Sequence, residues 1–175
     1  MSTGDDKVYN EFNNVERGVR MQRVANLLAI KDNQVLLLQK PRRGWYVAPG
    51  GKMESGESIY EAAIREFQEE TNVTPKEVHL KGVFTMVIMD EGKQVDEWML
   101  FTFIAREVEG VPFKETREGN LSWMPIEELK TLPMAEGDRT NLLFAIEQEG
   151  IQYGTFQYTK DFELIDAKFQ QSKEI

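Results

Sequence analysis

The sequence contains no cysteine and only one histidine. Without cysteine the chain has no disulfides, no thiolate metal ligands and no thiol nucleophile. The single histidine, His79, begins a predicted strand and has no partner at the spacing of a metal site, so we interpret it as structural or exposed. Chemistry based on thiols or on a histidine cluster is therefore excluded.

Long apolar runs are also missing. No run approaches the ~18 residues that a membrane-spanning helix needs. Residues 1–6 have neither the basic start nor the apolar stretch of a secretory signal. We therefore expect a cytoplasmic protein without a membrane partner.

Basic residues are in short supply, since 21 Lys and Arg face 30 Asp and Glu and give a net charge of −9. Tight binding to a nucleic-acid backbone needs a basic surface, so we expect no stable nucleic-acid binding. A small phosphorylated substrate stays compatible with this charge, because a metal ion can neutralise its phosphates. Carboxylate ligands for such a metal would themselves make the chain acidic.

The length of 175 residues suits one domain with its own core. Residues 1–20 are polar, and we expect a leader that is either flexible or a short surface helix. We predict a single domain over residues 21–160 and a C-terminal tail over residues 161–175. The oligomeric state is left open, and a homodimer is one option.

Hydrophobic patterning and turn signals predict several strands and two helices. Strands that pair with near neighbours and are interrupted by helices indicate a mixed α/β sheet rather than a doubly wound parallel one. The predicted strands cover residues 23–30, 35–39, 79–89, 97–105, 121–124 and 155–159, and the predicted helices cover 58–71 and 141–149, with a helical turn at 126–129.

The helix predicted over residues 58–71 has clear ends and an apolar stripe. Ser58 and Glu61 fit the S-x-x-E capping box that begins a helix. Asn72 suits the left-handed position after the last turn, because Asn tolerates positive φ. The side chains that fall on the broad core stripe are Ile59, Tyr60, Ala63, Ile64, Phe67 and Thr71.

Beside that stripe lies a sector with three carboxylates and no Lys or Arg. Glu66, Glu69 and Glu70 fall within about 100° of one another, together with the small Ala62. Like charges at this spacing destabilise an isolated helix, whereas a divalent cation makes the cluster favourable. Mg²⁺ prefers such oxygen ligands together with substrate phosphates. The alternative interpretation is a solvated acidic face.

The surroundings of the helix complete a longer pattern. Gly50 and Gly51 permit close approach of the backbone to a ligand. The chain follows G-x5-E-x7-R-E-U-x-E-E-x-G-U, where U is apolar, except that Asn72 replaces the last glycine. It therefore resembles the Nudix hydrolase family, which implies the Nudix fold, a mixed β-sheet sandwiched between helices. The matching residues are Gly51, Glu57, Arg65, Glu66, Phe67, Glu69, Glu70 and Val73.

The resemblance implies hydrolysis of a phosphoanhydride bond with Mg²⁺, or Mn²⁺ as a substitute. Glu66, Glu69 and Glu70 would be metal ligands, helped by the Gly50 carbonyl. A metal-activated water would attack phosphorus in line. The remaining box residues, Glu57 and Arg65, would orient the loop and the helix, with Arg65 outside the carboxylate sector.

A second resemblance concerns the segments outside the box. Asp96 to Met99 is similar to the stretch of MutT-type enzymes in which a glutamate reaches the metal site. Glu97 is thus the candidate fourth carboxylate and alternative general base, and its other interpretation is an exposed charge at a strand start. Residues 39–57 resemble the MutT/8-oxo-dGTP diphosphatase branch of Gram-positive bacteria. Spacing leaves open which glutamate is the base.

Substrate-binding residues follow from the same resemblance and from charge. Arg can bind a phosphate through two hydrogen bonds, although cationic loop residues are often only solvated. An Asn or Asp near the start of the last helix would read the purine edge, with Trp45, Tyr46 and Phe84 as stacking partners or core residues. The candidates for the phosphates are Lys40, Arg42, Arg43 and Lys52, and those for the purine are Asp138, which could also be a helix cap, and Asn141.

The function implied is hydrolysis of a nucleoside triphosphate, preferably an oxidised purine nucleotide such as 8-oxo-dGTP, to a monophosphate and pyrophosphate. Other Nudix substrates remain alternatives: a hyperphosphorylated guanine nucleotide, a dinucleoside polyphosphate, a nucleotide sugar or an RNA 5′ end. An alternative of another class is a nucleotide-sensing module without activity. Such modules usually lose box carboxylates, and here all of them are present.

Overall fold

The computed structural model describes residues 21–172. The predicted leader over residues 1–20 lies outside the described residues. Within the described part of the chain, no helix is long and apolar enough to cross a membrane.

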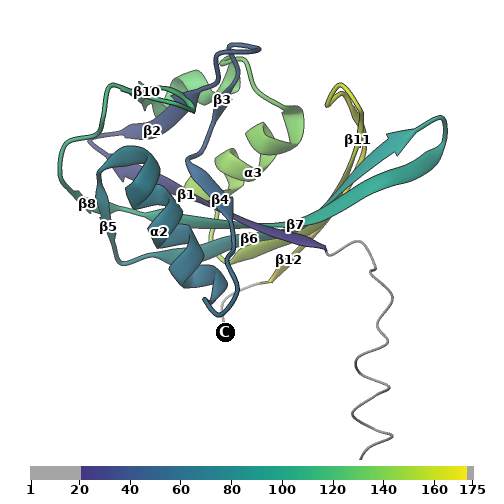
Figure 1. Cartoon of the computed structure of the whole chain (residues 1–175), viewed down its shortest axis with the longest axis horizontal. Coiled ribbons are helices and arrows are strands. Elements are labelled where there is room, and N and C mark those ends of the chain that lie inside the picture. The colour runs from purple at the N-terminus through teal and green to yellow at the C-terminus, as the bar shows by residue number, and fades with distance from the viewer. Residues whose placement is uncertain (1–20, 173–175) are drawn as a thin grey trace, which may run out of the picture.

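A mixed sheet forms the centre of the molecule (Figure 1). Its strand order is β12-β11-β6-β7-β1-β2-β10-β9, with β3 beside β2 and β4 beside β1. The pairs β1–β7 and β6–β11 are parallel, whereas β6–β7, β1–β2 and β11–β12 are antiparallel. The strands are β1 (Gln22–Lys31), β2 (Gln34–Gln39), β3 (Tyr46–Val47), β4 (Gly50–Lys52), β5 (Thr74–Lys76), β6 (His79–Asp90), β7 (Lys93–Ala105), β8 (Glu107–Glu109), β9 (Glu115–Thr116), β10 (Gly119–Pro125), β11 (Ile151–Thr159) and β12 (Leu164–Ser172).

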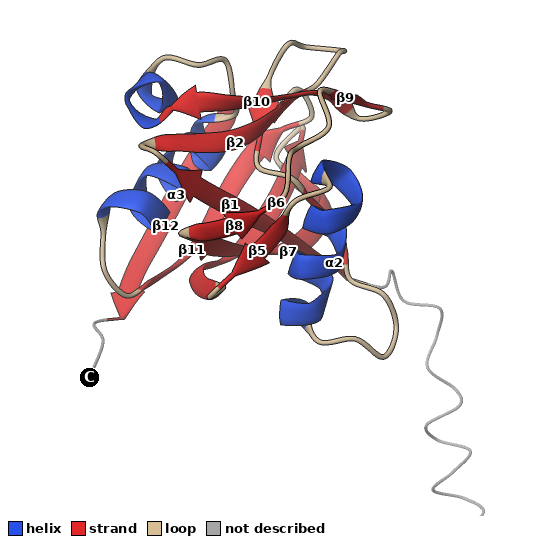
Figure 2. Ribbon diagram, turned by 90° about the vertical axis from the view of Figure 1, so that its left-hand side faces the viewer, coloured by secondary structure: helices blue, strands red, loops and turns tan. Residues whose placement is uncertain are grey.

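Two α-helices lie on opposite faces of the sheet (Figure 2). They are α2 (Ile59–Thr71) and α3 (Glu136–Glu147), and a 3₁₀ helix, η1 (Ile126–Lys130), precedes α3. Successive strand side chains point to opposite faces. Ala25 and Leu27 of β1 therefore pack in the α2 cluster, whereas Leu28 packs in the α3 cluster. This arrangement confirms the predicted α/β/α sandwich.

The capping signals of α2 act as the sequence predicts. The Ser58 hydroxyl accepts a hydrogen bond from the Glu61 backbone N–H at 3.1 Å, and the Glu61 carboxylate accepts one from the Ser58 N–H at 2.7 Å. Asn72 adopts a left-handed φ of 63°, and its N–H donates to the Gln68 carbonyl. The helix is thus closed at both ends by local contacts, which is why its boundaries were predictable.

The last helix begins five residues before the predicted start at residue 141, since α3 starts at Glu136. Ala135 at its N-cap has no capping side chain, so the usual signal is missing. Instead Arg139 reaches back and donates to the carbonyls of Leu129 and Leu132, which ties the first turn to η1.

The predicted C-terminal tail over residues 161–175 is wrong for most of its length. Strand β12 occupies Leu164–Ser172 and pairs antiparallel with β11 from Ile151 to Tyr158. Its side chains are mostly exposed, so the strand has little of the apolar alternation on which a prediction depends. Backbone pairing with β11, rather than burial, makes it part of the sheet.

Candidate active site

The loop before α2 and the helix are held together through glycine backbone. The N–H of Gly50 donates to the Glu70 carboxylate at 3.0 Å. Gly51 lies against Glu66, and a Cβ at this position would overlap its carboxylate. Two helix glutamates therefore rest directly on the loop, and this approach requires the missing side chain of Gly51.

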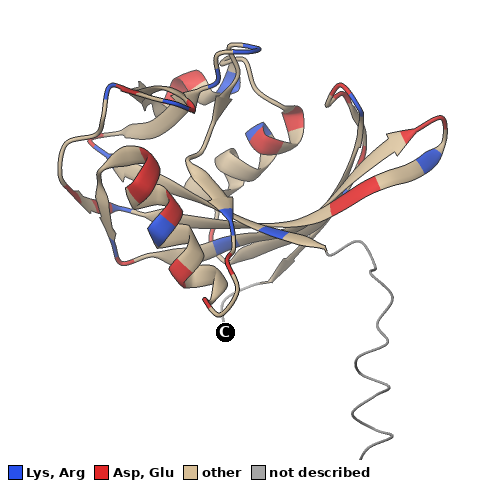
Figure 3. Ribbon diagram, in the orientation of Figure 1, with Lys and Arg blue, Asp and Glu red and all other residues tan. Residues whose placement is uncertain are grey.

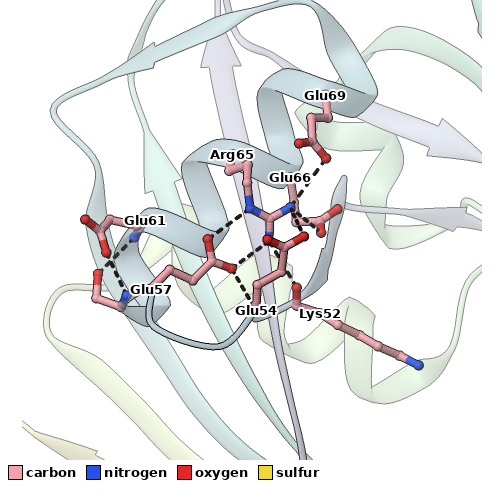
Figure 4. A network of polar contacts seen from close by, with 8 residues as sticks. Lys52, Glu54, Glu57, Glu61, Arg65, Glu66 and Glu69 are labelled. Carbon is pink, nitrogen blue, oxygen red and sulfur yellow. Dashed lines mark hydrogen bonds and ion pairs between the residues drawn. The ribbon is translucent and has the colours of Figure 1, made fainter.

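Arg65 is the centre of the polar network on α2 (Figure 4). Its guanidinium donates to both carboxylate oxygens of Glu57, at 2.9 and 2.6 Å, and to the Lys52 carbonyl at 3.2 Å. The hydrogen bonds from Arg65 lower the pKa of Glu57 to about 2. The Glu57–Arg65 pair thus joins the loop before the helix to the helix itself.

The same guanidinium also reaches two of the helix carboxylates. It donates to Glu66 at 2.8 Å and to Glu69 at 3.4 Å. The sequence places Arg65 outside the carboxylate sector, but its long side chain crosses into that sector. Figure 3 shows this single basic band among the acidic ones of α2. A divalent cation is therefore not the only charge that can offset the repulsion among these glutamates.

Glu70 lies in a different environment from Glu66 and Glu69. It is half-buried, and its burial raises the pKa of the carboxyl group to about 7, although the Gly50 N–H and the charge of Lys40 act in the opposite direction. Within residues 21–172, no three Asp, Glu or His side chains are grouped closely enough to hold a metal ion as they stand. The reason is that Arg65 holds two carboxylates while the loop holds the third.

The donor chemistry of these residues nevertheless fits Mg²⁺. Glu66, Glu69 and Glu70 offer carboxylate oxygens, which are the ligands that Mg²⁺ prefers, and the Gly50 backbone lies beside one of them.

A further carboxylate near this cluster was missed by the sequence analysis. Glu118 forms an ion pair of 2.7 Å with Lys40, and its negative charge is close enough to raise the pKa of Glu70. Strand β10 pairs with β2 so that Asn120 is opposite Gln39, and this register brings Glu118 next to Lys40. No local pattern in the sequence marks Glu118, because only the pairing of distant strands places it there.

Glu97, the predicted fourth carboxylate, is not brought to the helix glutamates. It lies on β7 five residues before Thr102. Thr102 is opposite Asn26 of β1, and Asn26 is in turn opposite Gly50 of β4. Five strand residues correspond to about 16 Å. Glu97 instead accepts a hydrogen bond from Gln94 at 2.8 Å, near the β6–β7 turn. Glu97 is half-buried in the fifth position of β7, so it is also not the exposed charge at a strand start of the alternative interpretation.

A pocket of about 220 Å³ extends from the box to the start of α3. Glu70 and Gly50 line it on one side and Asp138 on the other, with apolar walls between them. Burial raises the pKa of Asp138 to about 6. The apolar residues of the walls include Val24, Leu38, Met86, Trp98, Leu100 and Phe162.

Two other polar side chains of this pocket were missed by the sequence analysis. The Asn26 side-chain oxygen is buried without a hydrogen-bond partner among the described residues. The buried Tyr158 hydroxyl lies against the backbone of Gly137. Both residues line the pocket. Buried polar atoms without partners are rare, so the Asn26 oxygen is the one available to a ligand. Neither residue belongs to a local motif.

Arg43 has partners that differ from those expected of a phosphate ligand. It donates to the Asp161 carbonyl at 2.7 Å, and its guanidinium lies 4.9 Å from the Trp45 ring and 5.9 Å from the Phe162 ring. Phe162 has a left-handed φ of 60°, which is unusual for a bulky residue. Through these contacts Arg43 holds the β11–β12 turn, and with it Phe162, against the pocket.

The other predicted phosphate ligands are distributed unevenly. Lys40 lines the pocket, and the exposed Arg42 lies with it in an adjoining cavity of about 410 Å³. Lys52 lies in a separate depression beside Met21 and Arg23, and its side chain extends away from the carboxylates in Figure 4. Lys40 and Arg42 thus lie at the cavities beside the box, whereas Lys52 lies away from them.

Of the two residues predicted to bind the purine, only one lies at the pocket. Asp138 lines both cavities. Asn141 is 1% exposed, donates to the Thr102 hydroxyl at 2.6 Å and faces the sheet, so it is a core residue rather than a pocket residue. The earlier start of α3 explains the difference, because it places Asp138 in the first turn and Asn141 one turn further. Of the predicted stacking residues, Trp45 lines the adjoining cavity, whereas Phe84 is fully buried.

Comparison with known proteins agrees with this geometry. Residues 20–143 match the model of the NUDIX domain. The chain is 50% identical over 148 residues to the uncharacterized Nudix hydrolase YvcI of Bacillus subtilis, covering 85% of this chain and 94% of that protein. It is 30% identical over 122 residues to the human 8-oxo-dGDP phosphatase NUDT18, covering 65% of this chain and 34% of that protein.

Among solved structures, the crystal structure of a MutT protein from Bacillus halodurans has a TM-score of 0.83 and 54% identity, covering 86% of this chain and 98% of that chain. The fold and the box therefore define a phosphoanhydride hydrolase. The chain belongs to the Nudix hydrolase family, whose members are enzymes that generally use divalent metal ions. The similarity to Bacillus proteins fits the predicted MutT-like branch of Gram-positive bacteria.

Proposed function

We propose that this enzyme hydrolyses a purine nucleoside triphosphate, preferably an oxidised one such as 8-oxo-dGTP, to the monophosphate and pyrophosphate. The observation that carries the proposal is the single pocket that has Glu70 and Gly50 at one side and Asp138 at the other. A nucleotide fits such a pocket, because its phosphates would lie at the side of Glu70 and its polar base at the side of Asp138.

Magnesium, with manganese as a substitute, is the proposed cofactor. Glu66, Glu69 and Glu70 would hold it with the Gly50 carbonyl, and Glu118 is positioned to contribute a further carboxylate. When bound, the ion would activate water and offset charge on the phosphates. Glu57 and Arg65 would orient the loop and the helix, and Lys40 and Arg42 would contact phosphate oxygens.

The chain's own residues supply a rationale for base recognition. Asp138 can accept hydrogen bonds from the N–H groups of a guanine edge when ionised, and can donate one when protonated. The Asn26 oxygen has no hydrogen-bond partner among the described residues, and it lines the same pocket together with Tyr158. The apolar walls, with Trp98 and Phe162, can enclose a flat ring. An oxidised purine carries an additional oxygen and an additional N–H, which these polar atoms could bind.

Similarity to proteins with assigned substrates supports the same class. The human relative is an 8-oxo-dGDP phosphatase, and the Bacillus halodurans structure is described as a MutT protein. We propose a cytoplasmic location, where such nucleotides occur.

The test is pyrophosphate and phosphate release with Mg²⁺ across GTP, dGTP, 8-oxo-dGTP, 8-oxo-dGDP, ppGpp and ADP-ribose. We expect the highest kcat/KM for an oxidised guanine nucleotide and a loss of at least about a hundredfold in Glu69→Gln, as for removal of a metal ligand. A higher kcat/KM for another nucleotide would contradict the proposed substrate. Full activity of Glu69→Gln would contradict the assignment of Glu69 as a metal ligand.

A further inference from the structure

Strand β12 forms one edge of the sheet, and its outer side is unpaired within residues 21–172. It is nine residues long, whereas β9 at the opposite end of the sheet has two. Proteins usually protect sheet edges with short strands, prolines or bulges. β12 contains no proline, and its one irregularity lies at its start, opposite Gln157 and Tyr158. The rest of the strand is a regular edge that another strand can join.

Apolar side chains accompany this free edge. Half of the large hydrophobic side chains that are exposed in the described structure belong to the β11–β12 hairpin. Exposed apolar side chains beside an unpaired edge are a feature of surfaces that bind another chain. The exposed apolar residues of the hairpin are Tyr153, Phe162, Leu164, Ile165 and Phe169.

The charged side chains of β12 indicate what the partner is. Asp166 and Lys168 lie on the same face of the strand, on either side of Ala167, which is opposite Phe156 and points to the other face. Both charged residues are exposed, and neither has an ion-pair partner among the residues that the structure describes. The strand therefore carries one negative and one positive charge placed symmetrically about Ala167.

We propose that β12 pairs antiparallel with β12 of a second copy of this chain, with the two Ala167 residues opposite each other on the two-fold axis. Each Asp166 is then opposite Lys168 of the partner subunit. Opposite charges directly across strands stabilise a sheet. The two sheets become one continuous sheet, and the interface is isologous, as in most homodimers.

The charges also exclude the neighbouring registers. A two-fold axis at Asp166 places two aspartates opposite each other, and an axis at Lys168 places two lysines opposite each other. Like charges directly across strands are destabilising. An axis between two residues is excluded, because it would oppose side chains from different faces of the sheet. The register centred on Ala167 is the one near the middle of the strand that makes two ion pairs.

The test measures the mass of the full chain by sedimentation equilibrium for wild type, Asp166→Lys and Lys168→Asp. We expect a wild-type dimer and an increase of about tenfold or more in the dimer dissociation constant of each variant, because two ion pairs become two repulsions. Both positions are exposed, so each variant should fold, which circular dichroism checks.

Mixing the two variants in equal amounts provides the decisive control. One then carries lysine at both positions and the other carries aspartate at both, so only the mixed pair is complementary. We expect a heterodimer with nearly wild-type affinity, and hydrolysis of nucleotides unchanged throughout. A monomeric wild type, a dimer that resists both changes, or a mixture that fails to restore pairing would overturn the proposal.

Discussion

Arg65 shows how one residue changes the electrostatics of a whole site. Its guanidinium binds Glu57 through two hydrogen bonds and also contacts Glu66 and Glu69. Without a metal ion it therefore offsets part of the repulsion among the box carboxylates. A divalent cation that binds Glu66 and Glu69 must compete with this contact, while the Glu57 pair can keep Arg65 in place.

Asp138 gives a prediction on pH at the residue scale. Burial raises its pKa from 3.8 to about 6, so the folded protein keeps a proton that the unfolded chain releases in this range. The contribution of Asp138 to the free energy of unfolding should therefore fall as the pH rises from about 4 to about 6, by up to about 3 kcal/mol, and then level off.

The neutral variant Asp138→Asn should lack this contribution. Its stability relative to wild type should be greater at pH 7 than at pH 4, as measured by urea unfolding at several pH values. Parallel curves for the two proteins would show that Asp138 does not carry a raised pKa. Since Asp138 is also proposed to bind the base, the variant should lose nucleotide affinity even where it is more stable.

At the scale of single elements, α2 depends on its capping box. Replacing Ser58 by Ala removes the hydrogen bond to the Glu61 N–H and should lower the free energy of unfolding by about 1 kcal/mol. Thermal unfolding measures the change. Ser55→Ala, in the same exposed loop, is the matched control and should have almost no effect; an equal loss in both variants would contradict the capping role.

The β11–β12 turn is an element whose position depends on one arginine. Arg43→Ala removes the contacts to Asp161, Trp45 and Phe162 and should raise KM for the nucleotide about tenfold, because the aromatic cover of the pocket is released. Steady-state kinetics measure the effect. Arg23→Ala is the control, because Arg23 is also an exposed arginine but lines neither the pocket nor the adjoining cavity, and it should leave KM unchanged.

Two comparisons separate this role from phosphate binding. If Arg43 acts through Phe162, Phe162→Ala should raise KM similarly, and the double variant should be little worse than either single one. If Arg43 contacted phosphate directly, the effects of Arg43→Ala and Phe162→Ala on KM would add in the double variant. That outcome would show that Arg43 does not act by holding the β11–β12 turn.

At the scale of the whole molecule, the sheet register decides which acidic residue outside the box belongs to the site. The register of β10 with β2 brings Glu118 to Lys40 and near Glu70, whereas that of β7 with β1 keeps Glu97 about five residues away along the strand. Glu118→Gln should therefore weaken Mg²⁺ activation by about tenfold or more, and Glu97→Gln should stay close to wild type. Titration of the activity with Mg²⁺ measures the effect of both variants. A larger loss in Glu97→Gln than in Glu118→Gln would show that Glu97, and not Glu118, is the carboxylate that belongs to the site.

The sequence by itself determined the features that depend on short spacings. The capping box, the left-handed Asn72, the two faces of α2 and the glycines before it all act within about one helical turn or one loop. The short, nearly continuous apolar runs of β1 and β2, bounded by turn residues, likewise predicted two core strands. These are local preferences of the chain, so one sequence suffices to predict them.

Only the tertiary structure decided the rest of the site. Asn26 and Tyr158 come to the pocket, and Glu118 comes to Lys40, from strands and turns far from the box, whereas Asn141 faces the sheet. Strand β12 exists because its backbone finds β11 as a partner, although its exposed side chains give almost no signal. Pairing between distant segments depends on the packing of the whole sheet, and local patterns contain no information on that register.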